Sequence, residues 1–396
     1  MGRCADRKRQ RLWLVAALVI DLGLLMVFKY TGFVLETIGL GQLLPGPIPL
    51  PLGISFYTFQ VVSYMVDIYR NIVPAENNLV CFSTYMTFFP QLIAGPIVRY
   101  DELRTQLSDR QETWHKIADG FCLLMIGLGK KMLLANPMGE LWEGLRALTG
   151  NTGILGAWAG AAAFTLQIYF DFSGYSDMAR GLGRMFGFEI PINFRYPYAA
   201  QSIQDFWRRW HITLSSWFRD YVYIPLGGSR RGAGRTVVNL FAVWVLTGLW
   251  HGAAWNYVLW GLYYFVLLTA ERLIGQVRLA YVPRALRHIL TMALVMVGWV
   301  LFAIEDFGAL GAYLYSLFSP SGGVISTQAA VWVLSYLPLM ALAALASLPF
   351  AADFVRRKNQ SAPVRWGAPV YCLLLLAAGT AALVAQSYNP FLYFRF

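Results

Sequence analysis

Long apolar stretches recur along the chain and alternate with short polar segments. Five of them are nearly free of charged side chains: residues 12–28, 154–170, 289–303, 329–350 and 370–385. Their lengths approach the roughly 20 residues with which an α-helix crosses the ~30 Å hydrocarbon core of a bilayer. Lipid offers no partner to an open backbone N–H or C=O group, so we predict that each stretch is a membrane-spanning helix.

Two further apolar stretches contain helix-breaking residues. Residues 79–98 end in a segment with Pro90, Gly95 and Pro96, and basic segments flank the stretch on both sides. Because proline removes a backbone donor and interrupts a helix, a re-entrant pair fits this stretch better than a crossing.

The second such stretch, residues 237–270, runs for 34 residues without a charge. As one straight helix it would be about 50 Å long, which exceeds a single span. Gly248 and Gly252 lie near its middle, on either side of His251. We therefore predict a kink or a hairpin at this point.

The composition supports a membrane protein. Hydrophobic residues make up 57% of the 396 residues and charged residues 13%, and the mean hydropathy is +0.50. Ordinary soluble domains carry about 25% charged residues, and a single soluble core stops growing near ~250–300 residues. We expect an all-α polytopic membrane protein with one integral domain over residues 1–396 and about nine to eleven membrane-embedded helices.

The net charge of +11 is distributed unevenly. Residues 31–50 and 306–327 contain no Lys or Arg, and 136–153 contain only Arg146, whereas the alternate segments are rich in basic residues: 3–11, 99–116, 180–235, 272–287 and 356–365. Because basic loops stay in the cytoplasm, we predict a cytoplasmic amino terminus, a retained first helix and an extracytoplasmic carboxyl terminus. The same basic face could attract an anionic substrate such as a coenzyme A thioester.

His251 is the first candidate for chemistry. It lies in the middle of the uncharged run, next to Trp250, and ionisable residues inside a membrane span are costly and usually functional. The flanking glycines allow close approach of backbone or ligand. The alternative is a neutral histidine that donates one hydrogen bond between packed helices.

His211 lies in an aromatic and basic segment, which we predict to be one helix over residues 204–221. Asp205 and Arg209 are spaced to pair at i,i+4, and Trp207 and His211 lie on one stripe of such a helix. The segment is either an interfacial helix at the lipid headgroups or a helix that places His211 at the mouth of a cavity, with arginines near an anionic donor.

A third polar group, Asp171, Ser173, Ser176 and Asp177, follows the apolar stretch at 154–170. These residues either line the same cavity or mark the cytoplasmic end of the helix.

Several reaction types have no support in the sequence. It has no Gly-rich phosphate loop, no HExxH and no GxSxG motif, and its four cysteines lack metal-ligand or redox spacing, so we expect no metal. Nucleic-acid binding has no support beyond the net charge. Two histidines without a nucleophile motif suit direct acyl transfer, in which one imidazole acts as general base and N–H groups or an arginine stabilise the oxyanion.

Seven strings stand out in order along the chain: PLGISFYTFQ at 51–60, FFPQLIAGPI at 88–97, YFDFSGYSDMA at 169–179, DFWRRWHITLSSWFRDY at 205–221, YIPLGG at 223–228, LWHG at 249–252 and NPFLYFRF at 389–396. Together they resemble the membrane-bound O-acyltransferases (MBOAT), in particular the bacterial alginate O-acetyltransferase branch. The resemblance implies helices around a central funnel, with re-entrant and interfacial helices. It also implies that His251 is the catalytic histidine and His211 the second histidine of the family pattern.

Around this pair we take as candidate substrate-binding residues Asp171, Ser173, Asp205, Trp207, Arg208, Arg209 and Trp250. The resemblance further implies that acetyl moves from a cytoplasmic donor, acetyl-CoA, across the bacterial inner membrane toward an exopolysaccharide such as alginate. Expected partners are a periplasmic SGNH-type acetyltransferase and other polysaccharide-secretion subunits. Members of this branch usually begin with further membrane helices, so we expect some amino-terminal helices of the family to be missing from this chain.

Two alternatives stay open. The teichoic-acid D-alanyl-transfer branch of the same family has related motifs and would use a carrier protein. A transporter without chemistry would also use broken helices and polar groups at membrane depth.

Overall fold

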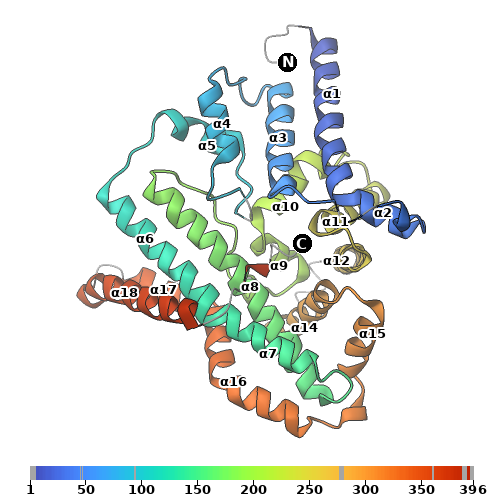
Figure 1. Cartoon of the computed structure of the whole chain (residues 1–396), viewed down its shortest axis with the longest axis vertical. Helices are drawn as coiled ribbons and strands as arrows, with labels where there is room; N and C mark the ends of the chain where they lie inside the picture. Colours follow the sequence, from blue (N-terminus) through green and yellow to red (C-terminus); the bar gives the residue numbers. More distant parts are fainter. Residues whose placement is uncertain are drawn as a thin grey trace.

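The computed structural model describes residues 6–44, 46, 48–92, 95–275, 281–358, 361–385 and 390–392 (Figure 1). Within these residues the chain is helical and contains no β-strand. The α-helices are α1 Arg7–Leu25, α2 Thr31–Thr37, α3 Ile54–Tyr69, α4 Leu79–Thr87, α5 Tyr100–Ser108, α6 Trp114–Gly129, α7 Asn136–Arg146, α8 Gly153–Met185, α9 Ile203–Arg209, α10 Ile212–Phe218, α11 Ala233–His251, α12 Trp255–Ile274, α14 Arg284–Ala303, α15 Phe307–Ser316, α16 Thr327–Ala346, α17 Phe350–Lys358 and α18 Ala362–Ala385. Three π-helical turns, η1 Met26–Tyr30, η3 Lys130–Ala135 and η5 Arg219–Tyr223, and three 3-10 turns, η2 Gly41–Leu43, η4 Pro197–Ala199 and η6 Pro320–Gly322, join or extend them.

Seven helices in the described part of the chain are long and apolar enough to cross a bilayer: Arg7–Thr37, Gly153–Met185, Ala233–His251, Trp255–Ile274, Arg284–Ala303, Thr327–Ala346 and Trp366–Ala385. The five predicted spans fall on five of them, although the helix predicted over 329–350 ends at Ala346. The chain is therefore an all-α multi-pass membrane protein. The count of nine to eleven embedded helices stays a prediction, because it includes shorter helices.

Parts of some predicted features lie outside the described residues: residues 3–5 with Cys4, 93–94, 276–280, 359–360, 389 and 393–396.

The longest helix, α8, packs against α6 through glycines. Gly120 faces Gly181, and Gly127 faces Gly174, so both pairs repeat at seven residues in antiparallel helices. A Cβ atom on Gly127 would lie 2.5 Å from the Gly174 carbonyl oxygen. Because lipid gives no hydrophobic drive for two helices to associate, small residues that permit close backbone contact hold such pairs together.

The predicted break in residues 237–270 is a hairpin. Helix α11 ends at His251, residues 252–254 are not helical, and α12 begins at Trp255 and packs back along α11. The two backbones approach so closely that a Cβ on Gly248 would meet the Tyr257 carbonyl at 2.3 Å. Glycine at this position therefore permits the hairpin, and the hairpin leaves His251 at the end of a helix.

The apolar stretch at 79–98 is also broken as predicted, since α4 ends at Thr87. The Tyr85 hydroxyl donates to the Val98 carbonyl (3.1 Å), and the Gln91 amide nitrogen donates to the Tyr85 carbonyl (3.0 Å). These bonds hold the returning chain against α4. Re-entrance into the membrane stays a prediction.

The prediction of one continuous helix over 204–221 is wrong. Helix α9 ends at Arg209, and His211 has a φ of 43°, in the left-handed region, before α10 begins at Ile212. The preceding segment fixes this break, because Arg195 N–H donates to the Arg209 carbonyl and Ile212 N–H donates to the Asn193 carbonyl, each at 3.0 Å. Propensity within 204–221 cannot reveal bonds to a segment outside it.

Candidate active site

His251 ends α11 inside a shell of aromatic rings. Its side chain is 7% exposed, and its ring makes edge contacts with Trp250, Trp260 and Phe302 at centroid distances of 4.8, 5.0 and 5.3 Å. Trp250 is held in turn by α3, where its indole nitrogen donates to the Ser55 carbonyl (3.3 Å). The hairpin and α14 thus hold His251 in an apolar environment.

A small cavity adjoins His251. Its volume is about 20 Å³, and its lining comes from α8, α11, α14, the α9–α10 break and the carboxyl-terminal segment: Ile168, Asp171, Phe172, Trp210, His251, Trp299, Phe302 and Leu392. A single water needs about 10–15 Å³ of such volume, so this space admits roughly one water. An acyl group can enter only if part of the lining moves.

The carboxyl end of α11 receives hydrogen bonds from the first helix. Lys29 Nζ donates to the Trp250 carbonyl (2.5 Å) and to Ser55 Oγ (3.1 Å), and the Tyr30 hydroxyl donates to the Leu249 carbonyl (2.8 Å). The last carbonyls of a helix carry partial negative charge, so an ammonium group at this end stabilises it. Sequence reasoning missed Lys29, although an ionisable residue at the end of an apolar run was a usable signal.

His211 is 1% exposed, and its tautomer follows from its contacts. Its Nδ1 lies 3.1 Å from Asn193 Oδ1, which also accepts from the Thr213 backbone N–H (3.2 Å) and hydroxyl (2.9 Å). Because that oxygen only accepts, Nδ1 carries the proton and Nε2 presents its lone pair. Nε2 is buried and has no hydrogen-bond partner among the described residues. Burial lowers the pKa of His211 to about 3, so the ring is neutral at pH 7.

The structure brings the two histidines together around Trp250 and Phe172. The Trp250 ring lies 6.0 Å from the His211 ring and 4.8 Å from the His251 ring. Phe172 makes an edge contact with His211 at 4.8 Å and lines the cavity next to His251. Residues far apart in the sequence therefore form one buried site, which none of their local patterns predicts.

Asp171 lies in the middle of α8 rather than at its end. Of the two alternatives for this polar group, the one in which it marks the end of the helix is wrong, because α8 continues to Met185. Asp171 lines the cavity and pairs with Lys131 at 2.5 Å, and the two side chains are 3% and 6% exposed. The interpretation that Asp171 lines the histidine cavity is therefore the one the structure supports. Hydropathy alone cannot tell a buried ion pair from a helix end.

The other candidate residues lie at different depths. Trp207 packs against Trp244 and Tyr264, at 4.7 and 4.8 Å, and against Trp260 at 5.7 Å, which places it behind the ring that touches His251. Ser173 is buried in α8, and its hydroxyl has no hydrogen-bond partner among the described residues.

The charged residues of α9 do not line the cavity beside His251. Asp205 and Arg209 form the expected ion pair at 2.8 Å, with 33% and 37% of their side chains exposed, and Arg208 is exposed. They lie at the surface rather than in the buried histidine site.

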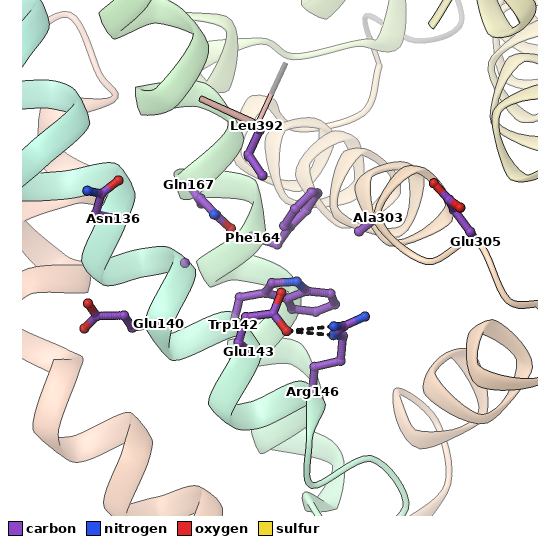
Figure 2. Close-up of a pocket in the computed structure, with 11 residues that line it drawn as sticks. Asn136, Glu140, Trp142, Glu143, Arg146, Phe164, Gln167, Ala303, Glu305 and Leu392 are labelled. Carbon is purple, nitrogen blue, oxygen red and sulfur yellow. Dashed lines mark hydrogen bonds and ion pairs between the residues drawn. The ribbon is translucent and has the colours of Figure 1, made fainter. Parts of the chain in front are cut away.

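A larger cavity of about 360 Å³ lies beyond Leu392, which lines both cavities. Its lining mixes polar and apolar side chains from α7, α8, the end of α14 and the carboxyl-terminal segment: Asn136, Gly139, Glu140, Trp142, Glu143, Arg146, Phe164, Gln167, Ala303, Glu305 and Leu392 (Figure 2). Arg146 donates to Glu143 at 2.7 Å, and Figure 2 shows Leu392 above Phe164 and Gln167.

In the part of the chain that the structure describes, no three His, Cys, Asp or Glu side chains cluster so as to hold a metal ion. The absence of a metal stays a prediction.

These features define a class: a multi-pass helical membrane protein with a buried pair of histidines beside a cavity. The sequence profile of the membrane-bound O-acyltransferase family matches residues 76–307, a range that contains both histidines. A probable alginate O-acetylase of Pseudomonas aeruginosa is 38% identical, over 98% of this chain and 86% of the relative.

Two further relatives are named for other activities. A peptidoglycan O-acetyltransferase of Helicobacter pylori is 31% identical over 98% of this chain and 83% of its own length. A teichoic acid D-alanyltransferase of Bacillus subtilis is 32% identical over 55% of this chain and 58% of its own length. The chain belongs to the membrane-bound O-acyltransferase family, and it is an acyltransferase.

Proposed function

We propose that this acyltransferase moves acetyl from acetyl-CoA on the cytoplasmic side of the bacterial inner membrane toward a polysaccharide on the other side, with His251 as general base. The observation that carries the proposal is the position of His251, buried at a helix end beside a small cavity that shares the lining residue Leu392 with a larger one. Two relatives that match nearly the whole chain are named as an O-acetylase and an O-acetyltransferase. Their names support acetyl as the group that is transferred. The first of them supports alginate as the polymer.

The distribution of the basic segments supports this direction of transfer. Glu140, Glu143 and Glu305 line the larger cavity and lie in or beside segments 136–153 and 306–327, which are poor in Lys and Arg. The positive-inside rule assigns these segments to the extracytoplasmic side, together with the carboxyl terminus, and leaves the amino terminus in the cytoplasm. The larger cavity is then the entrance for the acyl acceptor, and the basic surface with Arg208 and Arg209 receives the anionic donor.

The reaction needs one base and one leaving group. An imidazole nitrogen of His251 takes the proton of the acceptor hydroxyl while the hydroxyl oxygen attacks the thioester carbonyl carbon. The C–S bond breaks, the ester forms, and the coenzyme A thiolate takes up the proton from the imidazolium. In the tautomer inferred from its contact with Asn193, His211 has a lone pair at Nε2 that can accept a hydrogen bond, so we assign it the orientation of a hydroxyl or amide in the site. It does not serve as an oxyanion donor in that tautomer, because oxyanion stabilisation needs an N–H group.

Radiolabelled acetyl-CoA tests this proposal directly. We expect membranes with the wild-type chain, together with a periplasmic SGNH-type acetyltransferase and polysaccharide, to incorporate label into polymer. His251→Gln should reduce incorporation at least 100-fold, in line with the loss of a general base. His115→Gln makes the same change at an 84% exposed histidine and should have no effect.

Normal incorporation by His251→Gln would exclude His251 as the base. If that variant still exported a small substrate while the wild type acetylated nothing, a transporter would be the better assignment.

The similarity to a teichoic acid D-alanyltransferase supports a second candidate function. In that case the donor is a D-alanyl carrier protein rather than acetyl-CoA. Stimulation of transfer by a purified charged carrier, with no incorporation from acetyl-CoA, would favour this second function.

A further inference from the structure

The carboxyl-terminal residues 390–392 lie inside the molecule, between the helices that form the histidine site. In Figure 1 this short red segment lies in the middle of the view, apart from α17 and α18 at the left edge. Lys131 Nζ donates to the Pro390 carbonyl (3.2 Å), and the Leu392 backbone N–H donates to Asp171 Oδ2 (2.8 Å). The segment is therefore bound through its backbone by two charged side chains.

Ring contacts add to these bonds. The Lys131 ammonium lies 4.8 Å from the centroid of the Phe391 ring, which also makes an edge contact with Tyr175 at 5.1 Å. A cation over an aromatic face is stabilised most where water is excluded, and Lys131 is buried. All three described residues of the segment thus contact η3 or α8.

The chemistry of Lys131 and Asp171 matches this ligand. A buried ion pair is seldom more stable than two apolar residues of the same size, because desolvation offsets the attraction. Both members of this pair also make hydrogen bonds outside the pair. The second carboxylate oxygen of Asp171 accepts from the Leu392 N–H, and the Lys131 ammonium also donates to the Pro390 carbonyl. Without them, the Leu392 N–H and the Pro390 carbonyl would each lose a partner within the protein, which weakens the docking of the segment.

We propose that Lys131 and Asp171 form a clasp that docks residues 390–392 as a removable partition between the two cavities. Leu392 is the one described residue that lines both the 20 Å³ cavity at His251 and the 360 Å³ cavity. The smaller space is too small for an acetyl group, so part of its lining must shift before donor and acceptor meet at His251, and in this scheme that part is the partition. Lys131 and Asp171 are positioning residues in this scheme. The docking is independent of the proposed function, whereas its effect on transfer rests on it.

Thiol labelling tests the clasp without any reaction. The four native cysteines are replaced by alanine, Leu392→Cys is introduced as reporter, and the rate of its modification by a maleimide is measured in detergent-solubilised protein. We expect slow labelling in this background. Lys131→Met should accelerate it on the order of tenfold, the size expected from the loss of a hydrogen bond to a charged group.

The neighbouring lysine provides a matched control. Lys130 lies in the same turn and pairs with Asp177 of α8 at 2.6 Å, and no bond from Lys130 to residues 390–392 occurs in the described structure. Lys130→Met removes a comparable ion pair between the same two segments and should leave the labelling rate unchanged. Equal rates in Lys130→Met and Lys131→Met would overturn the clasp.

A variant in residues 390–392 provides a second test that does not depend on the folding of Lys131→Met. Phe391→Ala leaves η3 and α8 intact and removes the contacts with Lys131 and Tyr175, so it should also accelerate labelling at position 392. If Lys131→Met does not fold, this variant decides the question: an unchanged labelling rate in Phe391→Ala would overturn the proposal.

The effect on the reaction has a separate readout. If the segment partitions the site, Lys131→Met should raise hydrolysis of acetyl-CoA without acceptor while acetyl transfer to polymer falls, because water reaches His251. A merely structural role would lower both activities together. Absence of acetyl-CoA turnover in the wild type would contradict the proposed function and leave the labelling result valid.

Discussion

At the scale of single residues, His211 is the position where backbone and side chain both depart from the ordinary. Its φ of 43° is uncommon outside glycine, and a strained residue of this kind persists only where its surroundings hold it. Those surroundings are visible: Asn193 accepts from the Nδ1–H, and the backbone on both sides of His211 is bonded to residues 193–195. The arrangement fixes one tautomer and directs the Nε2 lone pair into the buried site.

The burial of His211 predicts a pH dependence of stability. With a pKa lowered to about 3, the folded ring stays neutral, whereas in the unfolded chain it takes up a proton below about pH 6.5. The contribution to stability is therefore complete above pH 6.5 and is lost as the pH falls from there toward 3. At pH 5 the loss amounts to about 2 kcal/mol.

Thermal unfolding in detergent between pH 7.5 and 5 measures this dependence. We expect His211→Gln to reduce the fall in melting temperature, because glutamine does not titrate, and His115→Gln to leave it as in the wild type. The same fall in all three proteins would show that His211 is not buried in its neutral form.

The site could be predicted from the sequence only in part. His251 stands out because a histidine in a long uncharged run is costly, and no structure is needed to see it. His211 needed the family resemblance, since its segment also fits an interfacial helix. Asn193 could not be predicted, because a neutral amide in a coil carries no local signal and its role arises from tertiary contacts. Lys29 is an ionisable residue next to an apolar run, which is a usable signal. It was missed because the predicted span over 12–28 ends one residue before it.

At the scale of elements, the apolar pattern predicts where helices lie better than where they end. The spans over 154–170 and 289–303 are helices, yet the first continues for fifteen more residues, through Asp171 and Ser173 to Met185. Asp171 lies against η3 and the carboxyl-terminal segment, where it pairs with Lys131, and Ser173 is buried. A pattern based on hydrophobicity ends a helix wherever polar residues begin, so it fails where the polar residues are buried.

The glycine contact between α6 and α8 gives a prediction at this scale. Gly127→Ala places a methyl group 2.5 Å from the Gly174 carbonyl oxygen and 2.6 Å from Met178 Cγ, so the helices must separate. We expect a destabilisation of about 1–3 kcal/mol, as for other overpacked contacts. A lower melting temperature in detergent measures it.

The matched control is a helical glycine that faces open space. Gly23 in α1 has nothing within 4 Å of an added Cβ, so Gly23→Ala should raise stability by up to about 1 kcal/mol through helix propensity. If both alanine variants were equally stable, the close packing of α6 on α8 would be wrong.

At the scale of the whole molecule, the uneven distribution of charge and the positions of the cavities support the same direction of transfer. The basic segment 180–235 contains α9 with its exposed Arg208, whereas the larger cavity is lined by Glu140, Glu143 and Glu305, in or beside segments with almost no basic residues. The charge pattern could be predicted from sequence, and the orientation inferred from it stays a prediction. The cavities could not be predicted, because they depend on how α7, α8 and α14 pack around Leu392.

The orientation of the chain in the membrane decides whether that larger cavity can receive an extracytoplasmic acceptor. Arg230 is exposed in the basic segment 180–235, and Phe318 is exposed in segment 306–327, which has no Lys or Arg. In a background without native cysteines, we expect Phe318→Cys to react with a membrane-impermeant maleimide on intact cells and Arg230→Cys to react only after permeabilisation, because basic segments stay in the cytoplasm. Both should react equally in detergent, which controls for local accessibility. The reverse pattern would turn the carboxylate-lined cavity toward the cytoplasm, and an acceptor on the far side of the membrane could then not enter through it.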